Sequence, residues 1–340
     1  MSSARSGVEA LLPPLVAAFG PPGREGGVRS AIRRALRGIG TLREDTGGNL
    51  QVHVPGRGPR LLVTAHMDAT GVIVSRVDSS GLARLAILGT RPAADLVGAR
   101  IHFEDGGRAI VGTERPKAGK DAGEMDADSL FLDAGLSAAE AKRRLPVGSV
   151  GALEDRAERL GAYWCGANLD NRAGCAALIA ALRAIRKTRY DLHAVFTAQS
   201  ELGGRGAATS AFGIDPDLAV VVDVAPMDSK GPDGVAPGSG PCLALKEDGY
   251  VAHPEALALA RRAATAARIH TQWLIREAEG SDARTVRGSR AGVPTVLIGI
   301  AARRTGGPAA LIHERDLTQT AALVAQVLRG GPARTKGGRR

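Results

Sequence analysis

The sequence predicts an α/β protein with a mostly parallel β-sheet, helices on both faces of that sheet, and an inserted small β domain. Two observations predict the sheet: from residue 172 onward helical patterns alternate with short apolar runs, and those runs are almost continuously apolar, as parallel strands buried on both faces are. A third observation predicts the insertion. Between residues 72 and 161, short stretches alternate apolar and polar residues and are separated by glycine-containing turns.

Helical periodicity and apolar runs place the elements of the α/β part. The stretch 172–186 has apolar side chains at helical spacing along one face, which predicts an amphipathic helix. The runs 191–199 and 217–224 are short and apolar at their centres, which predicts buried strands. In chain order we expect a helix at about 27–38, strands at 49–54 and 60–65, a helix at 172–186, a strand at 191–199, a small-residue helix after residue 201, a strand at 217–224, a helix at 254–268, strands at 269–275 and 293–301, and a helix at 316–328.

Length and composition set the domain organisation. With 340 residues, 44% of them hydrophobic, the chain can bury a large core and exceeds the usual size of one domain. We therefore expect a main α/β domain formed by residues 1–71 and 162–328, and an inserted β domain at 72–161 with one short helix at 137–145. The basic end, residues 329–340, is expected to be a disordered tail.

Neither membrane insertion nor secretion is expected. The longest apolar run, 295–302, is far shorter than a membrane span, and the paired prolines Pro13 and Pro14 argue against a signal peptide. Three cysteines without CxxC spacing predict neither a disulfide framework nor a zinc knuckle. We expect a soluble, cytoplasmic protein with reduced cysteines.

The charge of the chain raises the possibility of nucleic-acid binding. The formal net charge is +10, but the arginines are spread along the chain and only 3% of residues are aromatic, which leaves little for base stacking. An arginine-rich solvated surface explains the charge better. Nucleic acid is therefore not the expected partner.

Four side chains with metal-binding chemistry fall where predicted strands end or helices begin. His66 ends the strand at 60–65, Glu201 follows the strand at 191–199, Asp223 lies in the strand at 217–224, and Asp170 precedes a helix. In a parallel sheet these ends share one edge, so the four can converge. One histidine with three carboxylates suits zinc, manganese or cobalt. Asp68 is placed to orient the His66 ring.

Each position also has a purely structural interpretation. Asp170 is a candidate helix N-cap, Glu201 can complement a helix dipole, and Asp223 can simply be solvated at a strand end. A single His-x-Asp turn is often incidental. The metal interpretation depends on all four lying at one sheet edge, which the structural interpretations do not predict.

The sequence resembles the tetrahedral, or glutamyl (deblocking), metallo-aminopeptidases, a family of dinuclear-metal peptidases with a zinc-exopeptidase-like fold, some of which carry the older name endoglucanase. The resemblance runs nearly end to end. The motifs that carry it are FGPPGREGGVR, DTGGNLQV, AHMDATGVIV, DSLFLDAGLSAAEA, PVGSVGAL, GANLDNRAG, FTAQSELGGRGA, VVVDVA, GSDA and GVPTVLIGI.

The resemblance implies a role for each site residue. His66 and Asp223 would hold one metal ion, Asp170 would bridge two ions, and Glu201 would hold the second ion. Asp68 would orient His66. The family also implies peptide substrates with free N-termini, and a homo-oligomer in which the β insertion forms dimers that build a larger shell.

Two departures from the family pattern affect the chemistry. The family has two adjacent glutamates, the first of which is its general base, where this chain has Ser200 and Glu201. The family's last metal-ligand histidine corresponds to Gly306. Milder is Asn171, which replaces the second residue of the usual Asp-Asp pair. His313, seven residues after Gly306, is a candidate substitute ligand, and a surface histidine is its structural alternative. Asp282 lies near the family's pocket or caps the helix that follows it.

These departures lead to two hypotheses from different classes. In the first, the protein is an aminopeptidase with one strongly bound ion at His66, Asp170 and Asp223, and Glu201 acts as the base, because a serine hydroxyl does not accept a proton at neutral pH. The number of divalent ions, one or two per chain, distinguishes this arrangement from the usual one. In the second, the protein is a non-catalytic homologue with a structural or regulatory role.

Overall fold

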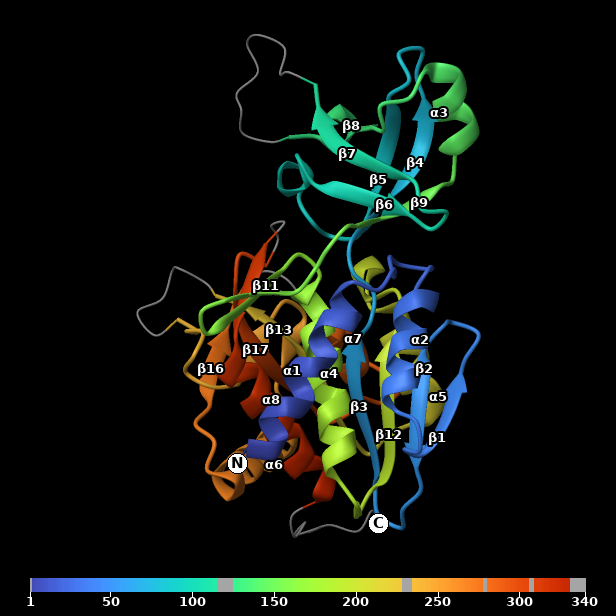
Figure 1. Ribbon diagram of the computed structural model, residues 1–340. Coiled ribbons are helices and arrows are strands. Elements are labelled where there is room, and N and C mark those ends of the chain that lie inside the picture. Colours follow the sequence, from blue (N-terminus) through green and yellow to red (C-terminus); the bar gives the residue numbers. More distant parts are fainter. Residues whose placement is uncertain (1, 115–124, 228–233, 278–279, 306–308, 331–340) are drawn as a thin grey trace.

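The computed structural model describes residues 2–114, 125–227, 234–277, 280–305 and 309–330, arranged as a large α/β part below a small β-barrel (Figure 1). The expected fold class is confirmed: a mostly parallel sheet has helices on both faces, and a separate antiparallel barrel interrupts it in sequence.

The large sheet contains 12 strands, and its centre is parallel. β12 and β13 flank β3, and β13 pairs with β17, all in parallel. Along the sheet the order is β1 (Thr41–Glu44), β2 (Leu50–Val54), β12 (Asp191–Thr197), β3 (Arg60–His66), β13 (Leu218–Pro226), β17 (Thr295–Arg303), β18 (Ala310–His313), β11 (Tyr163–Gly166) and β10 (Glu158–Leu160). A side branch pairs with β17 and consists of β14 (Cys242–Glu247), β15 (Tyr250–Val251) and β16 (Gln272–Ile275).

Helices cover both faces of this sheet, because its central strands are apolar on both sides. On one face, a single core joins the sheet to α1 (Ser2–Val16), α2 (Gly26–Ala35), α4 (Leu169–Ala184), α6 (Pro254–Ala267) and α8 (Glu314–Arg329). The other face packs against α5 (Arg205–Ile214) and α7 (Asp282–Arg287).

Helix α1 is an element that the sequence did not predict. It contains Pro13 and Pro14, and a proline inside a helix costs about 3 kcal/mol. Leu12, Leu15 and Val16 are nevertheless buried in the core that includes α4 and α8, and each fully buried aliphatic side chain contributes about 1.5–3 kcal/mol. Burial therefore outweighs the helix-breaking tendency of the two prolines.

The inserted part is a closed six-stranded barrel in the order β4, β5, β8, β7, β6 and β9. Its strands are β4 (Gly71–Val77), β5 (Ala83–Leu88), β6 (Arg100–Phe103), β7 (Arg108–Thr113), β8 (Leu130–Asp133) and β9 (Val150–Leu153). Helix α3 (Ala138–Arg144) begins with a capping box between Ser137 and Glu140. The barrel strands end at Leu153, whereas β10 pairs in the large sheet, so the barrel is shorter than the predicted insertion of 72–161.

The last helix ends close to the start of the predicted tail, residues 329–340. Helix α8 continues to Arg329, one residue into the predicted tail, and residues 331–340 lie outside the described residues. Cys165, Cys175 and Cys242 are all free thiols. Among the described helices, none has the length and apolar character needed to cross a bilayer.

Candidate metal centre

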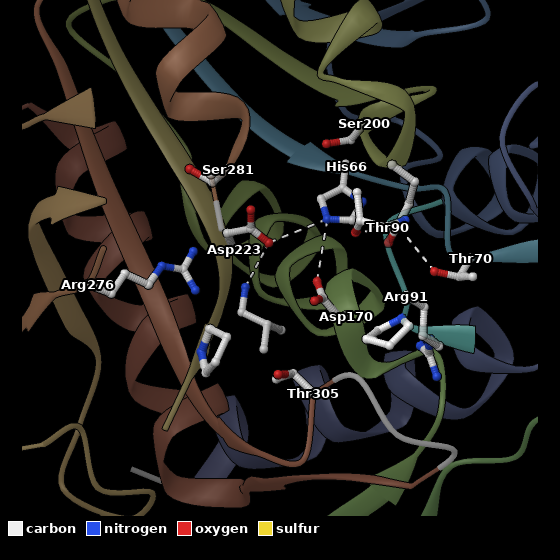
Figure 2. Close-up of a pocket in the computed structure, with 15 residues that line it drawn as sticks. His66, Thr70, Thr90, Arg91, Asp170, Ser200, Asp223, Arg276, Ser281 and Thr305 are labelled. Atoms are coloured by element: carbon white, nitrogen blue, oxygen red, sulfur yellow. Dashed lines mark hydrogen bonds and ion pairs between the residues drawn. The ribbon is translucent and has the colours of Figure 1, made fainter. Parts of the chain in front are cut away.

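Three of the predicted ligands meet at the carboxyl ends of the parallel strands (Figure 2). Nε2 of His66 lies 3.4 Å from Oδ1 of Asp170 and 3.5 Å from Oδ1 of Asp223. One donor atom from each of the three residues lies within 4.8 Å of the other two. His66 ends β3, Asp223 lies in the neighbouring β13, and Asp170 lies at the start of α4. These three side chains therefore converge at one edge of the sheet, as predicted.

The start of α4 departs from helical geometry at the point that supplies Asp170. Asn168 is the N-cap of α4, so Asp170 is not the cap, and both Asp170 and Asn171 have non-helical backbone angles. The fully buried Asn171 donates from Nδ2 to the carbonyl of Val222 (2.9 Å) and accepts from the N–H of Gly174 (3.0 Å). Asn171 thus fastens the first turn of α4 to β13, one residue from Asp223.

Asp68 lies beneath the site and is completely buried. Its Oδ1 is 3.5 Å from Nδ1 of His66, and its carbonyl oxygen is 3.2 Å from the same nitrogen. The carboxylate also accepts the backbone N–H groups of Ser200 (3.1 Å) and Glu201 (2.9 Å). Asp68 therefore contacts the imidazole and also holds the backbone that presents Glu201.

Glu201 faces the same cavity from the 3-10 helix Ser200–Leu202. Its Oε2 accepts from the hydroxyl of Thr70 (3.0 Å) and the backbone N–H of Thr90 (3.3 Å). At Gly89, where φ is +144°, an added Cβ would lie 2.7 Å from that oxygen, so this close approach requires glycine. Burial raises the pKa of Glu201 to about 7, despite the opposing effect of His66.

Ser200 lines the cavity, but its hydroxyl is bonded away from the histidine. Oγ of Ser200 donates to Oδ1 of Asp282 (2.7 Å), and Thr197 donates to Oδ2 of the same carboxylate (2.7 Å). Asp282 is buried, and burial raises its pKa. The suggested capping role of Asp282 is wrong: Ser281 caps α7 by accepting from the N–H of Ala283 (3.1 Å).

His313 is not brought to the site. It ends β18, caps α8 by accepting the N–H of Arg315 at Nδ1 (3.1 Å), and packs edge-on against Tyr163. It does not line the cavity around His66. Gly306, which corresponds to the family's last metal-ligand histidine, lies outside the described residues.

The cavity above the cluster is open to solvent, with an empty volume of about 750 Å³. Sequence reasoning missed several of its lining residues, including Arg91 and Arg276, which come from the barrel connection and the loop after β16. Arg276 donates to the buried Glu247 (2.9 Å), and Arg91 donates to the carbonyl of Ala167 (3.0 Å). No short motif surrounds either arginine, so their place at the site follows only from the tertiary fold.

The acidic groups of the cluster shift the pKa values of its members. Burial lowers the pKa of His66, but the charge of Asp223 and hydrogen bonding to Asp170 outweigh burial and raise that pKa well above its ordinary value. Burial raises the pKa of Asp223 to about 6. The charges of Asp170 and Asp282 raise the pKa of Asp223 further. An imidazole and oxygen donors in such a setting fit a divalent cation of the zinc, cobalt or manganese class.

Comparison with known proteins places the chain in a family. The family model of the M42 glutamyl aminopeptidases matches residues 48–323. The lysyl aminopeptidase of Pyrococcus furiosus is 28% identical over 317 residues, which cover 89% of this chain and 91% of that protein. Among solved structures, an aminopeptidase from the archaeon Desulfurococcus kamchatkensis superposes with a TM-score of 0.88 at 26% identity, over 96% of this chain and 95% of that one.

A further structure has the same fold at lower identity and is known as an assembly. The TET1 peptidase of Pyrococcus horikoshii superposes with a TM-score of 0.85 at 21% identity, over 96% of this chain and 99% of that one, and it assembles into a tetrahedron or a large octahedral shell. From the convergence of His66, Asp170 and Asp223 on this fold and the match over most of its length, the chain belongs to the M42 family of glutamyl aminopeptidases.

Proposed function

We propose that this protein is a metal-dependent aminopeptidase that hydrolyses peptides from their free N-termini. The observation that carries the proposal is the group of three donor atoms, from His66, Asp170 and Asp223, within 4.8 Å of one another at a solvent-open cavity. Three protein ligands are the number found in catalytic metal sites that keep one position open.

These residues would hold a zinc, cobalt or manganese ion. When bound, such an ion polarises the scissile carbonyl and makes water a better nucleophile near neutral pH. We propose one strongly held ion per catalytic centre. In support, Glu201 lies outside the group of three, its Oε2 is engaged by Thr70 and Thr90, and His313 is elsewhere.

Glu201 is the proposed proton acceptor. A general base works best when its pKa lies near the working pH, and burial raises the pKa of Glu201 to about 7. Asp68 holds the Glu201 backbone, and Thr70 and Thr90 hold one oxygen of its carboxylate. The cavity carboxylates, Asp170 and Glu201, also provide the negative charge that would attract the substrate ammonium group.

The test compares the full-length protein with the His66→Ala variant, each loaded with zinc or cobalt after removal of bound metal. We expect the wild type to hydrolyse aminoacyl-p-nitroanilides, and the variant to lose that activity and one ion per chain. Loss of two ions would contradict the one-ion arrangement. Hydrolysis that survives in His66→Ala would contradict the function itself.

One observation favours a second candidate, a metal-binding homologue without peptidase activity. The hydroxyl of Ser200 is bonded to Asp282, so the position that carries the family's base offers no free proton acceptor. This candidate predicts that metal-loaded protein binds one ion through His66 and yet fails to hydrolyse aminoacyl and peptide substrates.

We also propose that the protein is a homo-oligomer of cytoplasmic location. Three large apolar side chains on β15 and β16 are exposed, Val251 (65%), Trp273 (45%) and Ile275 (61%), and a monomer rarely leaves such side chains together in water. The three free cysteines are consistent with a reducing compartment.

A further inference from the structure

A second group of metal-binding side chains lies on the opposite edge of the sheet. It consists of His53, Asp191 and His193, here called the far-edge cluster, whose donor atoms lie within 4.8 Å of one another. His193 and Asp191 belong to β12 and His53 to its antiparallel neighbour β2 (Figure 1), where His53 and His193 are directly paired. Asp191 begins β12, whereas Thr197 at its other end pairs with His66. The cluster therefore lies four to six residues along β12 from the position paired with His66, or about 13–20 Å.

Both imidazoles turn the same nitrogen toward one carboxylate. Nε2 of His53 is 2.8 Å from Oδ1 of Asp191, and Nε2 of His193 is 3.3 Å from Oδ2. The two rings are stacked, with centroids 4.4 Å apart and planes inclined by 15°. Strand pairing therefore places two nitrogens and a carboxylate on one side, without help from a mobile loop.

A fourth residue fixes the ring of His193. Nε2 of the Gln51 amide lies 2.8 Å from Nδ1 of His193 and donates to it, so the ring proton of His193 is on Nε2, which faces Asp191. An amide can present either its nitrogen or its oxygen, since the two are related by a flip. When an ion binds at Nε2 of His193, the ring proton moves to Nδ1 and the amide turns its oxygen to accept it, which is the arrangement of metal-bound histidines.

The charges around the far-edge cluster also suit a cation. A hydrogen bond from His53 lowers the pKa of Asp191, so this carboxylate is ionised at neutral pH. Burial lowers the pKa of His193, so its ring is neutral there and available as a ligand. The nearby cation Arg60 is itself bonded to Asp215 (3.2 Å), and its backbone N–H to Asp217 (2.9 Å), so two further carboxylates offset its charge.

We propose that the far-edge cluster is a second metal site, which binds a zinc-class divalent ion through His53, Asp191 and His193. Two imidazoles and one carboxylate are ligands that zinc favours, and three protein ligands leave one position for water. All three side chains are only half-buried, so an ion can enter from solvent. The site is independent of the proposed peptidase activity because no residue is shared.

The experiment counts Zn²⁺ per chain by equilibrium dialysis of metal-stripped, full-length protein. We expect His193→Gln and His53→Gln each to bind one ion fewer than the wild type and to retain wild-type hydrolysis. His270→Gln, a histidine outside both sites, should bind as the wild type does. Gln51→Ala should keep the ion but hold it about 10- to 100-fold more weakly.

Two results would overturn the proposal. The first is an equal zinc count in wild type, His53→Gln and His193→Gln. The second is loss of an ion together with loss of hydrolysis in a variant with a wild-type circular dichroism spectrum, because that ion would then belong to the catalytic centre. His53 is the more exposed of the two histidines, so His53→Gln provides a folded variant if His193→Gln does not fold.

Discussion

At the scale of single residues, Ser200 stands where the family has its general base, and its side chain contacts Asp282. The Ser200 hydroxyl donates a hydrogen bond to the buried carboxylate of Asp282, which links the 3-10 helix to α7. Glu201, one residue later, lines the cavity together with Asp170 and Asp223. Substituting Ser200 and Glu201 separately therefore tests which of the two side chains accepts the proton.

We predict that Glu201→Gln lowers the rate of peptide hydrolysis by about 10²- to 10⁴-fold, the usual contribution of a positioned base. The amide cannot accept the proton, but the metal should remain bound because His66, Asp170 and Asp223 are unchanged. Steady-state hydrolysis and metal content measured on the same preparation check this.

Ser200→Ala is the matched control for Glu201→Gln. It leaves one oxygen of the buried Asp282 without its donor, which costs about 1–3 kcal/mol of stability, and should leave most of the hydrolysis rate. Full activity in Glu201→Gln together with an inactive Ser200→Ala would reverse the assignment of the base.

At the scale of elements, the first turn of α4 sets the position of Asp170. Asn171 bonds both to β13 and to the N–H of Gly174 within α4. A Cβ at residue 174 would lie 2.1 Å from Oδ1 of Asn171. The glycine is thus required by the packing of this turn.

We predict that Gly174→Ala destabilises the protein by about 1–3 kcal/mol, the usual cost of overpacking, and weakens metal binding because Asn171 and Asp170 must shift. Chemical denaturation and a metal titration measure the two effects. Gly213→Ala in α5 is the control: nothing lies within 4 Å of the added Cβ, so stability should be unchanged or higher by about 0.5–1 kcal/mol. Equal behaviour of the two variants would show that the turn tolerates a side chain.

Much of this element-level organisation was predictable. The central strands were identified because long apolar runs have few alternatives, and the convergence at their carboxyl ends follows from parallel topology. Helix α1 was missed because its prolines oppose a helix locally, and only burial against α4 and α8 stabilises it.

Contacts between distant residues could not be predicted in the same way. Asp282 bonds to Thr197 and Ser200, more than 80 positions earlier, and the local pattern before α7 is equally compatible with a helix cap. His313 was a candidate ligand only because it follows Gly306, and its capping bond to Arg315 is visible only in the folded chain. Sequence patterns identify which chemistry is present, whereas tertiary contacts decide which groups meet.

At the scale of the whole molecule, the buried titratable groups of the centre make stability depend on pH. The pKa values of Glu201 (about 7) and Asp223 (about 6) are raised by burial, so the folded protein binds more protons than the unfolded chain in that pH range. The pKa of His66 is also raised. The stability that protonated His66 contributes is therefore also lost as the pH rises. Stability therefore falls with increasing pH, because the native state holds the extra protons.

We predict that the melting temperature of metal-stripped protein falls between about pH 5 and pH 7, and that Glu201→Gln reduces this slope because it removes one of the titrating groups. A bound divalent ion replaces the protons, so zinc should stabilise the protein most at the upper end of this range. Calorimetry with and without zinc measures both effects. A melting temperature that rises over this interval in the metal-stripped protein would contradict the prediction.

For the assembly, we predict that Trp273→Glu or Ile275→Glu reduces the molar mass of the particle, because a charge replaces an exposed apolar side chain on edge strand β16. Light scattering after size-exclusion chromatography measures this. Phe212→Glu, an exposed site on α5 that packs beneath Arg290, is the control and should leave the mass unchanged. A monomeric wild type at micromolar concentration would refute the oligomer.

The hydrogen bond from the Thr90 backbone to Glu201 joins the segment after β5 to the 3-10 helix Ser200–Leu202, which follows β12 of the large sheet. The barrel and the proposed base are thus mechanically joined, through a stretch of chain that contains no other element between β5 and residue 90. A shift of the barrel relative to the 3-10 helix would displace this carboxylate. The rate of hydrolysis would then depend on how the barrel is held.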